Sequence, residues 1–281
     1  MKITSVPAVD NLLRTALAED AGNGDITTTS TIPEEAVAYG RYIAKQDGVL
    51  CGMPVVRAVF DLLDEDIELT INFKEGEHFK KGDVLAEVKG NARSVLTGER
   101  VGLNLLQHMS SIATMTDAAV KQVEGYKAKI VDTRKTTPGL RYLEKLAVRV
   151  GGGTNHRYNL SDGVLIKDNH IVAAGSITNA VKSARDNVPH TIKIEVEVED
   201  FDMMNEALEA GADIIMLDNM SCEDMKRAVE IIDGRAIVEA SGNMGEKNLA
   251  EVAATGVDLI SIGALTHSVK ALDISLKFKL I

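Results

Sequence analysis

A series of short apolar runs decides the fold: KIVDTRK (129–135), GVLIKDNH (163–170), TIKIEVEVED (191–200), ADIIMLDNM (212–220), AIVEASGN (236–243) and VDLISIGALTHS (257–268). Each run is rich in β-branched residues and ends in polar or charged ones. Matched positions in successive runs lie 22 to 34 residues apart, which is the rhythm of consecutive βα units. The runs therefore predict six parallel strands.

The segments between these runs predict helices. They include SITNAVKSARDN (176–187), DFDMMNEALEAGA (200–212), CEDMKRAVEIIDG (222–234) and EKNLAEVAATG (246–256). Their apolar residues recur at helical spacing, and most of the segments close on glycine, which signals the end of a helix. Apolar strands that alternate with helices form a parallel sheet buried on both faces.

An open doubly wound sheet and a closed barrel share this local pattern. Nearly every run ends in side chains capable of chemistry, which suits a barrel, because a barrel site draws on many strand ends and an open sheet has one crevice. Six strands in about 155 residues fall short of the eight in roughly 250 residues of a full barrel. We therefore expect an α/β fold with an incomplete or smaller barrel.

The first 90 residues predict a mixed layer of helices and strands. Strands are expected over 39–52, 67–73 and 83–90, and a helix over 54–64. The alternation in LDISLKFKLI (272–281) predicts a further strand, which returns to this part of the chain.

One long helix or a broken pair is expected over 93–125. A buried-face pattern runs along it with steps of three and four, at Leu105, Met109, Ile112, Thr116, Ala119 and Val123. We place the domain boundary within this helical region. The division is 1–108 for the first domain, with 270–281 returning to it, and 109–269 for the barrel.

The composition excludes several classes of partner. The 281 residues include 31 basic and 42 acidic side chains, so the formal net charge is −11 at pH 7. Ten aromatic residues and no Trp leave few platforms for stacking bases, and the negative charge repels phosphate backbones. No apolar run approaches the roughly 20 residues that cross a bilayer, and the start of the chain lacks an apolar signal core. We expect a cytoplasmic protein with no nucleic acid or membrane partner.

Basic residues gather at the ends of the first two strands. They are Arg134, Lys135, His156, Arg157 and Lys167. Arginine offers carboxylate or phosphate a bidentate fork, and lysine adds a mobile point charge. The alternative is a set of solvated surface charges or structural ion pairs. Their density at one rim of an acidic protein favours an anion site.

Acidic residues follow on the next two strands. Glu195 and Glu197 alternate within one run, so both can face the barrel interior, and Asp218 closes the next run. Such carboxylates suit a ribose diol or the water shell of Mg²⁺. Pairing with nearby lysines is the alternative interpretation.

The last two strands end in small residues, in SGNMG (241–245) and GALTHS (263–268). Glycine lets backbone N–H groups approach an anion closely, and the last strand-end loops of barrels often bind phosphate. Tight turns are the alternative, and His267 is either a phosphate donor or a polar residue at a helix start. Together, the three sectors indicate a ligand with several anionic groups, a diol or bound Mg²⁺, and a terminal phosphate.

Several separated motifs, in order, carry a resemblance to a known family. They are EDAGNGDITT (19–28), TGERVGLNLLQHMSSIAT (97–114), DTRKTTPGLRYLEKLAVRVGGGTNHRYNLSDGVLIKDNH (132–170), IEVEVE (194–199), MLDN (216–219), EASGNM (239–244) and SIGALTHS (261–268). The chain resembles the quinolinate phosphoribosyltransferases, also called nicotinate-nucleotide pyrophosphorylases (carboxylating). The resemblance implies an N-terminal open α/β sandwich, an incomplete α/β barrel of the seven-stranded type with TIM-like βα units, and a homodimer that can assemble further.

The resemblance also implies a reaction. Phosphoribosyl pyrophosphate and quinolinate become nicotinate mononucleotide, pyrophosphate and CO₂, with Mg²⁺, in de novo NAD synthesis. Carried over by motif, the quinolinate site comprises Arg100, Thr133, Arg134, His156, Arg157 and Lys167. Arg100 reaches the neighbouring subunit's site in this family.

The resemblance assigns a second set of residues to the phosphoribosyl donor. This set comprises Lys135, Glu197, Asp218, Ser241, Gly242, Asn243, Gly263, Ala264 and His267. The expected catalytic residues are Lys135, Lys167, Glu197 and Asp218. Mg²⁺ is expected to bind mainly through the pyrophosphate, with Glu197 and Asp218 reaching it through water. Asn243 stands where the family more usually has Gly, which affects the fine geometry of this loop.

Two other functions are consistent with parts of the sequence. A relative associated with molybdenum transport resembles the same motifs, although the cations directed at a dicarboxylate favour quinolinate. A non-catalytic carrier is suggested faintly by EGEHFKKGDVLAEVKG (75–90), with Lys89 as the attachment point. The residues flanking Lys89 match such a carrier poorly.

Overall fold

The computed structural model describes residues 2–281, which divide into two compact units. The first unit comprises the residues up to Asp117, Thr137–Gly152 and Ser268–Ile281. The second unit comprises Ala118–Thr136 and Gly153–His267. No helix in this described part of the chain is long and apolar enough to span a membrane.

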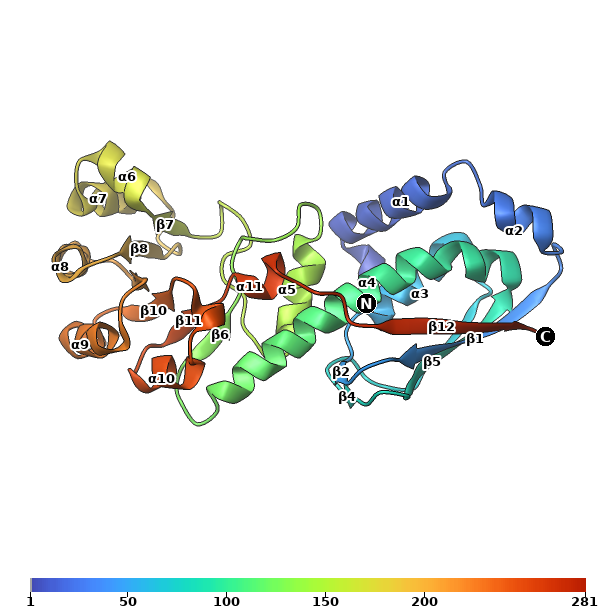
Figure 1. Ribbon diagram of the computed structural model, residues 1–281. Helices are drawn as coiled ribbons and strands as arrows, with labels where there is room; N and C mark the ends of the chain where they lie inside the picture. Colours follow the sequence, from blue (N-terminus) through green and yellow to red (C-terminus); the bar gives the residue numbers. More distant parts are fainter. Residues whose placement is uncertain (1) are drawn as a thin grey trace. The chain divides into compact units, whose positions relative to one another are not determined.

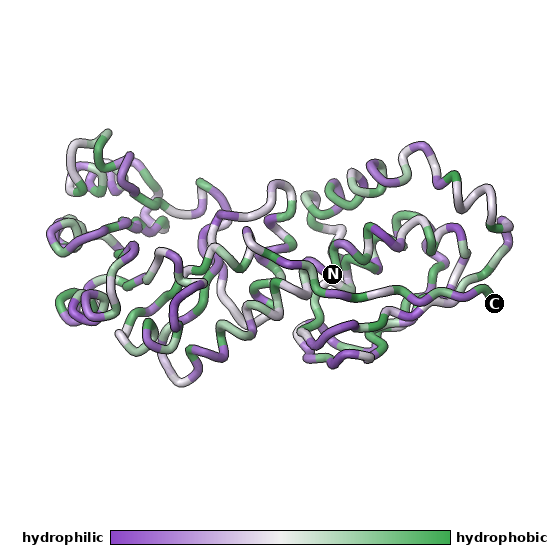
Figure 2. The backbone as a smooth tube through the Cα atoms, in the orientation of Figure 1, coloured by the Kyte–Doolittle hydropathy of each residue, from purple (hydrophilic) through white to green (hydrophobic). Residues whose placement is uncertain are grey.

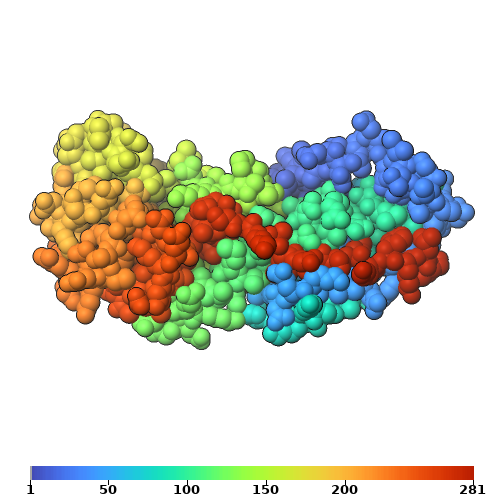
Figure 3. All heavy atoms as spheres, viewed as in Figure 1, coloured from blue at the N-terminus to red at the C-terminus, as the bar shows by residue number. Residues whose placement is uncertain are grey.

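The first unit is built on a four-stranded antiparallel sheet. Its strand order is β12 (Ile274–Leu280), β1 (Val37–Ala44), β5 (Val84–Asn91) and β3 (Glu68–Ile71), and a small second ladder joins β2 (Gly48–Val49) to β4 (His78–Phe79). The helical elements are η1 (Ile3–Ser5), α1 (Pro7–Ala21), α2 (Ile26–Thr31), α3 (Met53–Leu63), α5 (Arg141–Val150) and most of α4 (Ala92–Gln122). Figure 1 shows the C-terminal strand β12 beside β1, and Figure 3 shows it at the surface of this unit.

One face of this sheet is buried and the other is open. Along β1 the buried positions alternate with exposed ones, and Tyr42 packs in a core with Phe60 of α3 and Leu106 of α4. This is the alternation expected of an antiparallel sheet covered on one side. Lys89, the attachment point in the carrier alternative, lies within β5 opposite Tyr39 of β1, in the middle of the sheet.

Helix α4 is a single helix of 31 residues that ends at Gln122, so the expected helical region is one long helix rather than a broken pair. The predicted buried face is confirmed. Its six residues are all buried: Leu105, Met109, Ile112, Thr116, Ala119 and Val123.

The second unit is a six-stranded parallel sheet, and all six predicted runs form strands in it. Its order is β6 (Lys129–Val131), β11 (Leu259–Ser261), β10 (Ile237–Ser241), β9 (Ile214–Asp218), β8 (Ile194–Val198) and β7 (Val164–Ile166). The helical elements are α6 (Asp168–Ala174), α7 (Ile177–Asn187), α8 (Phe201–Glu209), α9 (Cys222–Ile232), η2 (Met244–Glu246), α10 (Leu249–Ala254) and α11 (Ala264–His267). Figure 2 shows hydrophilic and hydrophobic residues interspersed along the outer helices α7, α8 and α9.

The predicted incomplete barrel is confirmed. Strands β6 and β7 form the two edges of the sheet, and no ladder joins them to each other in the part of the chain that the structure describes. A single parallel bridge between Val131 and Thr154 adds a short seventh segment on the outer side of β6.

The helices begin where the sequence supplies capping side chains. Ser176, Asp200, Ser221 and Asn248 each accept a hydrogen bond from a backbone N–H of the first turn of the helix that follows. Such a cap contributes about 1 kcal/mol to a helix. Because each cap comes soon after a strand or loop, it fixes the point at which the chain turns back over the sheet.

Strand register sorts the side chains of the barrel into two layers. Glu195 of β8 lies opposite Ile214 of β9, and Glu239 of β10 lies opposite Met216 of β9. In-register neighbours in a parallel sheet point to the same face. The acids on β8 and β10 therefore share the interior face of the barrel, and the intervening apolar residues pack under the helices.

Candidate active site

The second unit gathers nearly all of the predicted site residues at the carboxyl ends of its strands. Thr133, Arg134 and Lys135 follow β6, Lys167 follows β7, Asp218 and Ser241 end β9 and β10, and Gly263 follows β11. Parallel strands place these ends at one rim. The basic, acidic and glycine-rich sectors therefore share one face of this unit.

The basic sector includes two arginines, Arg134 and Arg157. The Arg157 guanidinium donates from Nη1 to the carbonyl oxygen of Gly163 at 2.8 Å, which holds the side chain in place. Partial burial, followed by the positive charge of Arg134, lowers the pKa of Arg157 from its ordinary value. Two cations near enough to affect each other suit an anionic ligand, because a negative charge between them offsets their repulsion.

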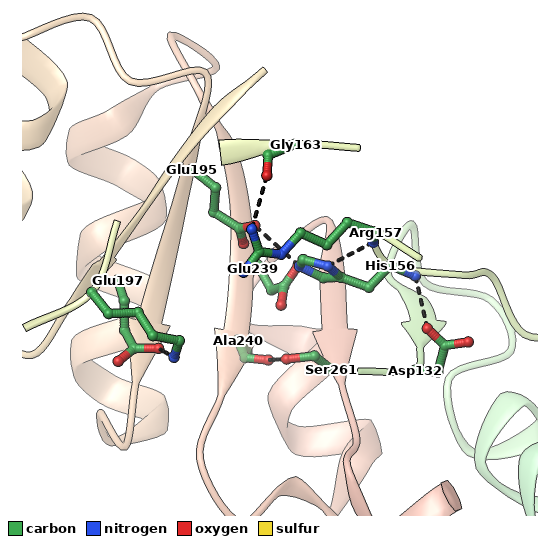
Figure 4. A network of polar contacts seen from close by, with 10 residues as sticks. Asp132, His156, Arg157, Gly163, Glu195, Glu197, Glu239, Ala240 and Ser261 are labelled. Carbon is green, nitrogen blue, oxygen red and sulfur yellow. Dashed lines mark hydrogen bonds and ion pairs between the residues drawn. The ribbon is translucent and has the colours of Figure 1, made fainter. Parts of the chain in front are cut away.

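The loop that carries Arg157 is anchored from below by Asp132, whose side chain is fully buried. One carboxylate oxygen of Asp132 accepts the backbone N–H of His156 at 2.9 Å, and the other accepts from the Asn155 side chain at 2.6 Å. Figure 4 shows this anchor beside the His156 ring. Asp132 thus fixes the backbone one residue before the arginine.

His156 makes protein contacts through both ring nitrogens. Its Nδ1 accepts the backbone N–H of Arg157 at 2.8 Å, and its Nε2 lies 3.1 Å from Glu195 and 3.7 Å from Glu239 (Figure 4). The ring therefore faces the barrel interior in this arrangement. That His156 contacts quinolinate stays a prediction.

Lys167 and Glu197 form an ion pair at the rim. The alternative interpretation, pairing of the strand acids with a nearby lysine, therefore holds for Glu197. Glu197 is only partly buried, and so is Asp218 on the neighbouring strand, which accepts from the Asn219 side chain at 2.8 Å. Two half-buried carboxylates that offer only oxygen atoms fit the outer shell of a hard cation such as Mg²⁺.

The loop after β10 needs a glycine at one position. Gly242 has φ +91°, and a Cβ there would lie 2.2 Å from Oδ1 of Asn219. Asn243, which stands where the family more usually has Gly, has φ +52°. Asparagine enters this left-handed region more readily than most residues, so the loop keeps a backbone shape that glycine would also adopt.

Lys135, Gly263 and His267 meet at the end of β11. A Cβ on Gly263 would lie 3.1 Å from both Cδ of Lys135 and Cδ2 of His267. The Thr266 hydroxyl donates to the Lys135 carbonyl oxygen at 2.8 Å, which ties the two loops together. On the other side, a Cβ on Gly245 would lie 3.1 Å from the Cβ of Ala264, so the two glycine-rich loops are in contact. The two interpretations of these loops, tight turns and an anion site, therefore do not exclude each other.

Arg100 is the one predicted site residue outside the second unit. It is exposed on α4 in the first unit. Its contribution to a neighbouring subunit's site stays a prediction.

Sequence reasoning missed two buried acids, Asp132 and Glu239. Asp132 lies directly after β6, and its position before the rim residues gave no sign of its role. Glu239 is two residues before Ser241 on the same strand, so the period-two rule would have placed it on the same inward face. The alternation along this strand therefore indicated Glu239, although the sequence analysis did not name it.

The fold and the three sectors are those of a class of barrel enzymes that act on a carboxylate-bearing substrate and a phosphate-bearing one. Family models for the quinolinate phosphoribosyl transferase N-terminal and C-terminal domains match residues 25–110 and 112–277. The chain belongs to the quinolinate phosphoribosyltransferase family.

Individual relatives agree over almost the whole chain. A probable nicotinate-nucleotide pyrophosphorylase (carboxylating) of Bacillus subtilis is 46% identical, over 94% of this chain and 91% of its own length. The nicotinate-nucleotide pyrophosphorylase (carboxylating) of Mycobacterium leprae is 43% identical, over 96% of each chain. The solved structure of the nicotinate-nucleotide pyrophosphorylase of Francisella tularensis has a TM-score of 0.92 at 42% identity, covering 97% of this chain and 96% of that one.

Proposed function

We propose that this protein transfers the phosphoribosyl group of phosphoribosyl pyrophosphate to quinolinate with decarboxylation. The products are nicotinate mononucleotide, pyrophosphate and CO₂, which makes the protein a pentosyltransferase of de novo NAD synthesis. The observation that carries the proposal is the meeting of arginines, carboxylates and glycine loops at one rim of the second unit. The names of the relatives support it.

Quinolinate carries two carboxylates, and the basic sector suits both. Arg134 and Arg157 supply bidentate forks, Lys167 supplies a point charge, and Thr133 lies beside them in the chain. The Thr133 hydroxyl accepts the backbone N–H of Lys135 at 3.1 Å, so its own proton is available to a ligand.

The phosphoribosyl donor occupies the remaining two sectors. Its phosphate lies against the loops that contain Ser241, Gly242, Asn243, Gly263, Ala264 and His267, with Lys135 at their junction. Glu197 and Asp218 face the ribose. Bound with the pyrophosphate, Mg²⁺ would neutralise charge on the leaving group, and Glu197 and Asp218 are the residues that would hold it through water.

The chemistry is displacement at the anomeric carbon by the pyridine nitrogen, through an oxocarbenium-like state. Glu197 and Asp218 stabilise the positive charge that develops on the sugar, as preorganised groups. Transfer makes the ring a pyridinium, which accepts the electron pair left by the departing CO₂. Decarboxylation therefore follows transfer, and Lys167, held by Glu197, is placed to stabilise the carbanion or supply its proton.

The proposal includes a homodimer in which Arg100 of one subunit reaches the site of the other, with further assembly possible in this family. It also includes a cytoplasmic location.

Ultraviolet detection of nicotinate mononucleotide tests the proposal. Purified protein is supplied with quinolinate and phosphoribosyl pyrophosphate, with and without Mg²⁺. We expect product only with both substrates and Mg²⁺. Pyrophosphate release that does not depend on quinolinate would instead favour the relative associated with molybdenum transport.

A further inference from the structure

Lys135 lies on the loop after β6 and is exposed. A lysine side chain carries its charge on a flexible four-carbon stem, so an exposed lysine adopts many positions unless something holds it. Ordering such a side chain at the moment of binding lowers the affinity for a ligand. A lysine that serves a phosphate site therefore benefits from a support. The structure provides one in Thr266, a threonine of α11 that is 1% exposed.

The loops that carry Lys135 and Thr266 follow neighbouring strands. The backbone N–H of Ile262 donates to the carbonyl oxygen of Val131 at 3.0 Å, which continues the ladder between β11 and β6 to the point where both loops begin. Beyond that point the Thr266 hydroxyl donates to the carbonyl oxygen of Lys135 at 2.8 Å. This hydroxyl thus joins two residues that lie 131 positions apart in the chain.

The Thr266 hydroxyl has one proton and two carbonyl oxygens within reach. The hydroxyl lies 2.8 Å from the Lys135 oxygen and 3.3 Å from the Gly263 oxygen. Hydrogen bonds between a hydroxyl and an oxygen are commonest at about 2.7–2.8 Å and rarely longer than about 3.0 Å. The proton therefore goes to Lys135. The hydroxyl does not simply bond back to its own helical turn.

The support extends from the backbone of Lys135 to its stem. A Cβ on Gly263 would lie 3.1 Å from Cδ of Lys135 and 3.1 Å from Cδ2 of His267, so the stem and the ring both pack on the bare α-carbon of Gly263. Gly263 and Thr266 belong to one turn, because the backbone N–H of Thr266 donates to the carbonyl oxygen of Gly263 at 3.1 Å. The bond to its carbonyl and the contact on its stem therefore hold Lys135 to the same turn.

We propose that Thr266 is a positioning residue that fixes Lys135 beside the loop after β11, so that the lysine meets the phosphoribosyl donor already ordered. A hydroxyl that only stabilised α11 would affect folding and would not discriminate between the substrates. A hydroxyl that positions Lys135 acts on the donor and much less on quinolinate. The inference rests on the proposed function for the identity of the donor, phosphoribosyl pyrophosphate.

Steady-state kinetics with each substrate varied in turn test the proposal. Thr266→Val keeps the shape of the side chain and removes its donor. We expect kcat/KM for phosphoribosyl pyrophosphate to fall about tenfold, as when one partner of a hydrogen bond is removed. The affinity for quinolinate, measured by titration calorimetry, should change far less. Thr266→Ser keeps the hydroxyl and should retain most of the wild-type kcat/KM.

Thr255→Val is the matched control. Thr255 is also a buried threonine of the second unit, 7% exposed, and its hydroxyl donates to the carbonyl oxygen of Val252 at 2.6 Å, three residues back along the chain. The control loses the same kind of bond away from the rim and should keep the wild-type kinetics for both substrates.

Three results would overturn the proposal: wild-type kinetics in Thr266→Val, equal losses for the donor and for quinolinate, or an equal loss in Thr266→Ser. If Thr266→Val does not fold, Thr266→Ser and Thr266→Ala form a second pair that differs only in the hydroxyl. The same expectations then apply to Thr266→Ala.

Hydrogen exchange of the ligand-free protein, followed by mass spectrometry, separates this inference from the proposed function. The backbone N–H groups of Lys135 and Thr136 are hydrogen-bonded within their own loop. We expect Thr266→Val to speed exchange in residues 133–137 about tenfold, and Thr266→Ser to leave it near the wild-type rate. If wild type forms no nicotinate mononucleotide, the proposed function fails and exchange alone decides the inference. Unchanged exchange over 133–137 in Thr266→Val would then refute it.

Discussion

In the proposed function, Arg134 and Arg157 are the residues on which recognition of a dicarboxylate depends most directly. Replacing either by Ala removes a charge-assisted bidentate contact, and we expect quinolinate binding to weaken by about 2–4 kcal/mol. Titration calorimetry measures this. Arg227→Ala is a matched control, because Arg227 lies over the Phe201 ring, 4.7 Å from its centroid, on the outer helix α9. Unchanged affinity in both site variants would reject their role.

In the proposed function, Glu197 and Asp218 belong to the chemical step rather than to recognition. Replacing either by Ala removes a preorganised negative group, and we expect turnover to fall by about a hundredfold or more. Steady-state rates at saturating substrate measure this. Because Glu197 also pairs with Lys167, its loss should disturb decarboxylation as well, which Asp218→Ala should affect less. Near wild-type turnover in both variants would exclude the assignment.

The buried acid Glu239 affects stability. Burial, followed by the negative charge of Glu195, raises its folded-state pKa to about 7, above the ordinary value near 4.5 that it regains on unfolding. Between these values the folded protein holds a proton that the unfolded chain releases, so stability falls as pH rises through this window. Glu239→Gln cannot ionise there. We expect the melting temperature of Glu239→Gln to rise relative to that of wild type as the pH increases from 5 to 8. A difference in melting temperature that stays constant over this range would contradict the raised pKa of Glu239.

At the scale of single elements, the periodicity of the sequence was sufficient for the barrel strands and for the long helix, whereas the single strand expected over 39–52 is two strands, β1 and β2. The six apolar runs are six strands, and the region from 93 onward is one helix with the expected buried face. These patterns are local, because a strand or helix buries one face at a fixed period. The seventh segment at Thr154 is a single bridge with no run of its own, so no period could reveal it.

The loop after β10 gives a prediction at this scale. Gly242→Ala adds a Cβ 2.2 Å from the Asn219 side chain, which holds Asp218, and it also forces alanine to φ +91°. Gly234 has φ +71° with no atom within 4 Å of an added Cβ, so Gly234→Ala carries the backbone strain alone. That strain costs about 1 kcal/mol.

We therefore expect the Michaelis constant for phosphoribosyl pyrophosphate to rise in Gly242→Ala and to stay unchanged in Gly234→Ala. Steady-state kinetics with the donor varied measure this. Asn243→Gly should keep wild-type kinetics, because the loop already has a left-handed backbone at that position. Equal effects of the two alanine variants would show that close approach at Gly242 is unimportant.

At the scale of the whole molecule, the proposed dimer makes Arg100 and Glu197 parts of one site on different subunits. Arg100→Ala and Glu197→Ala should each be nearly inactive alone. When they are unfolded together and refolded, about half of the dimers are hybrids with one intact site of two, so about a quarter of wild-type activity should return. Activity no greater than the average of the separate variants would show that Arg100 acts within its own subunit or not at all.

The sequence by itself determined the succession of strands and helices along the barrel part of the chain and the kinds of side chain that lie at the rim. Both follow from local rules: apolar periods select the element, and the residues after a parallel strand reach the same edge as those after its neighbours. Arg134, Lys167, Glu197 and Gly242 could be named for that reason. Only the tertiary structure decided the state of the interior. Whether Glu239 is charged depends on burial and on the groups that lie near it. Those groups come from β8, placed by strand register, and from the His156 loop, placed by its hydrogen bond to Asp132.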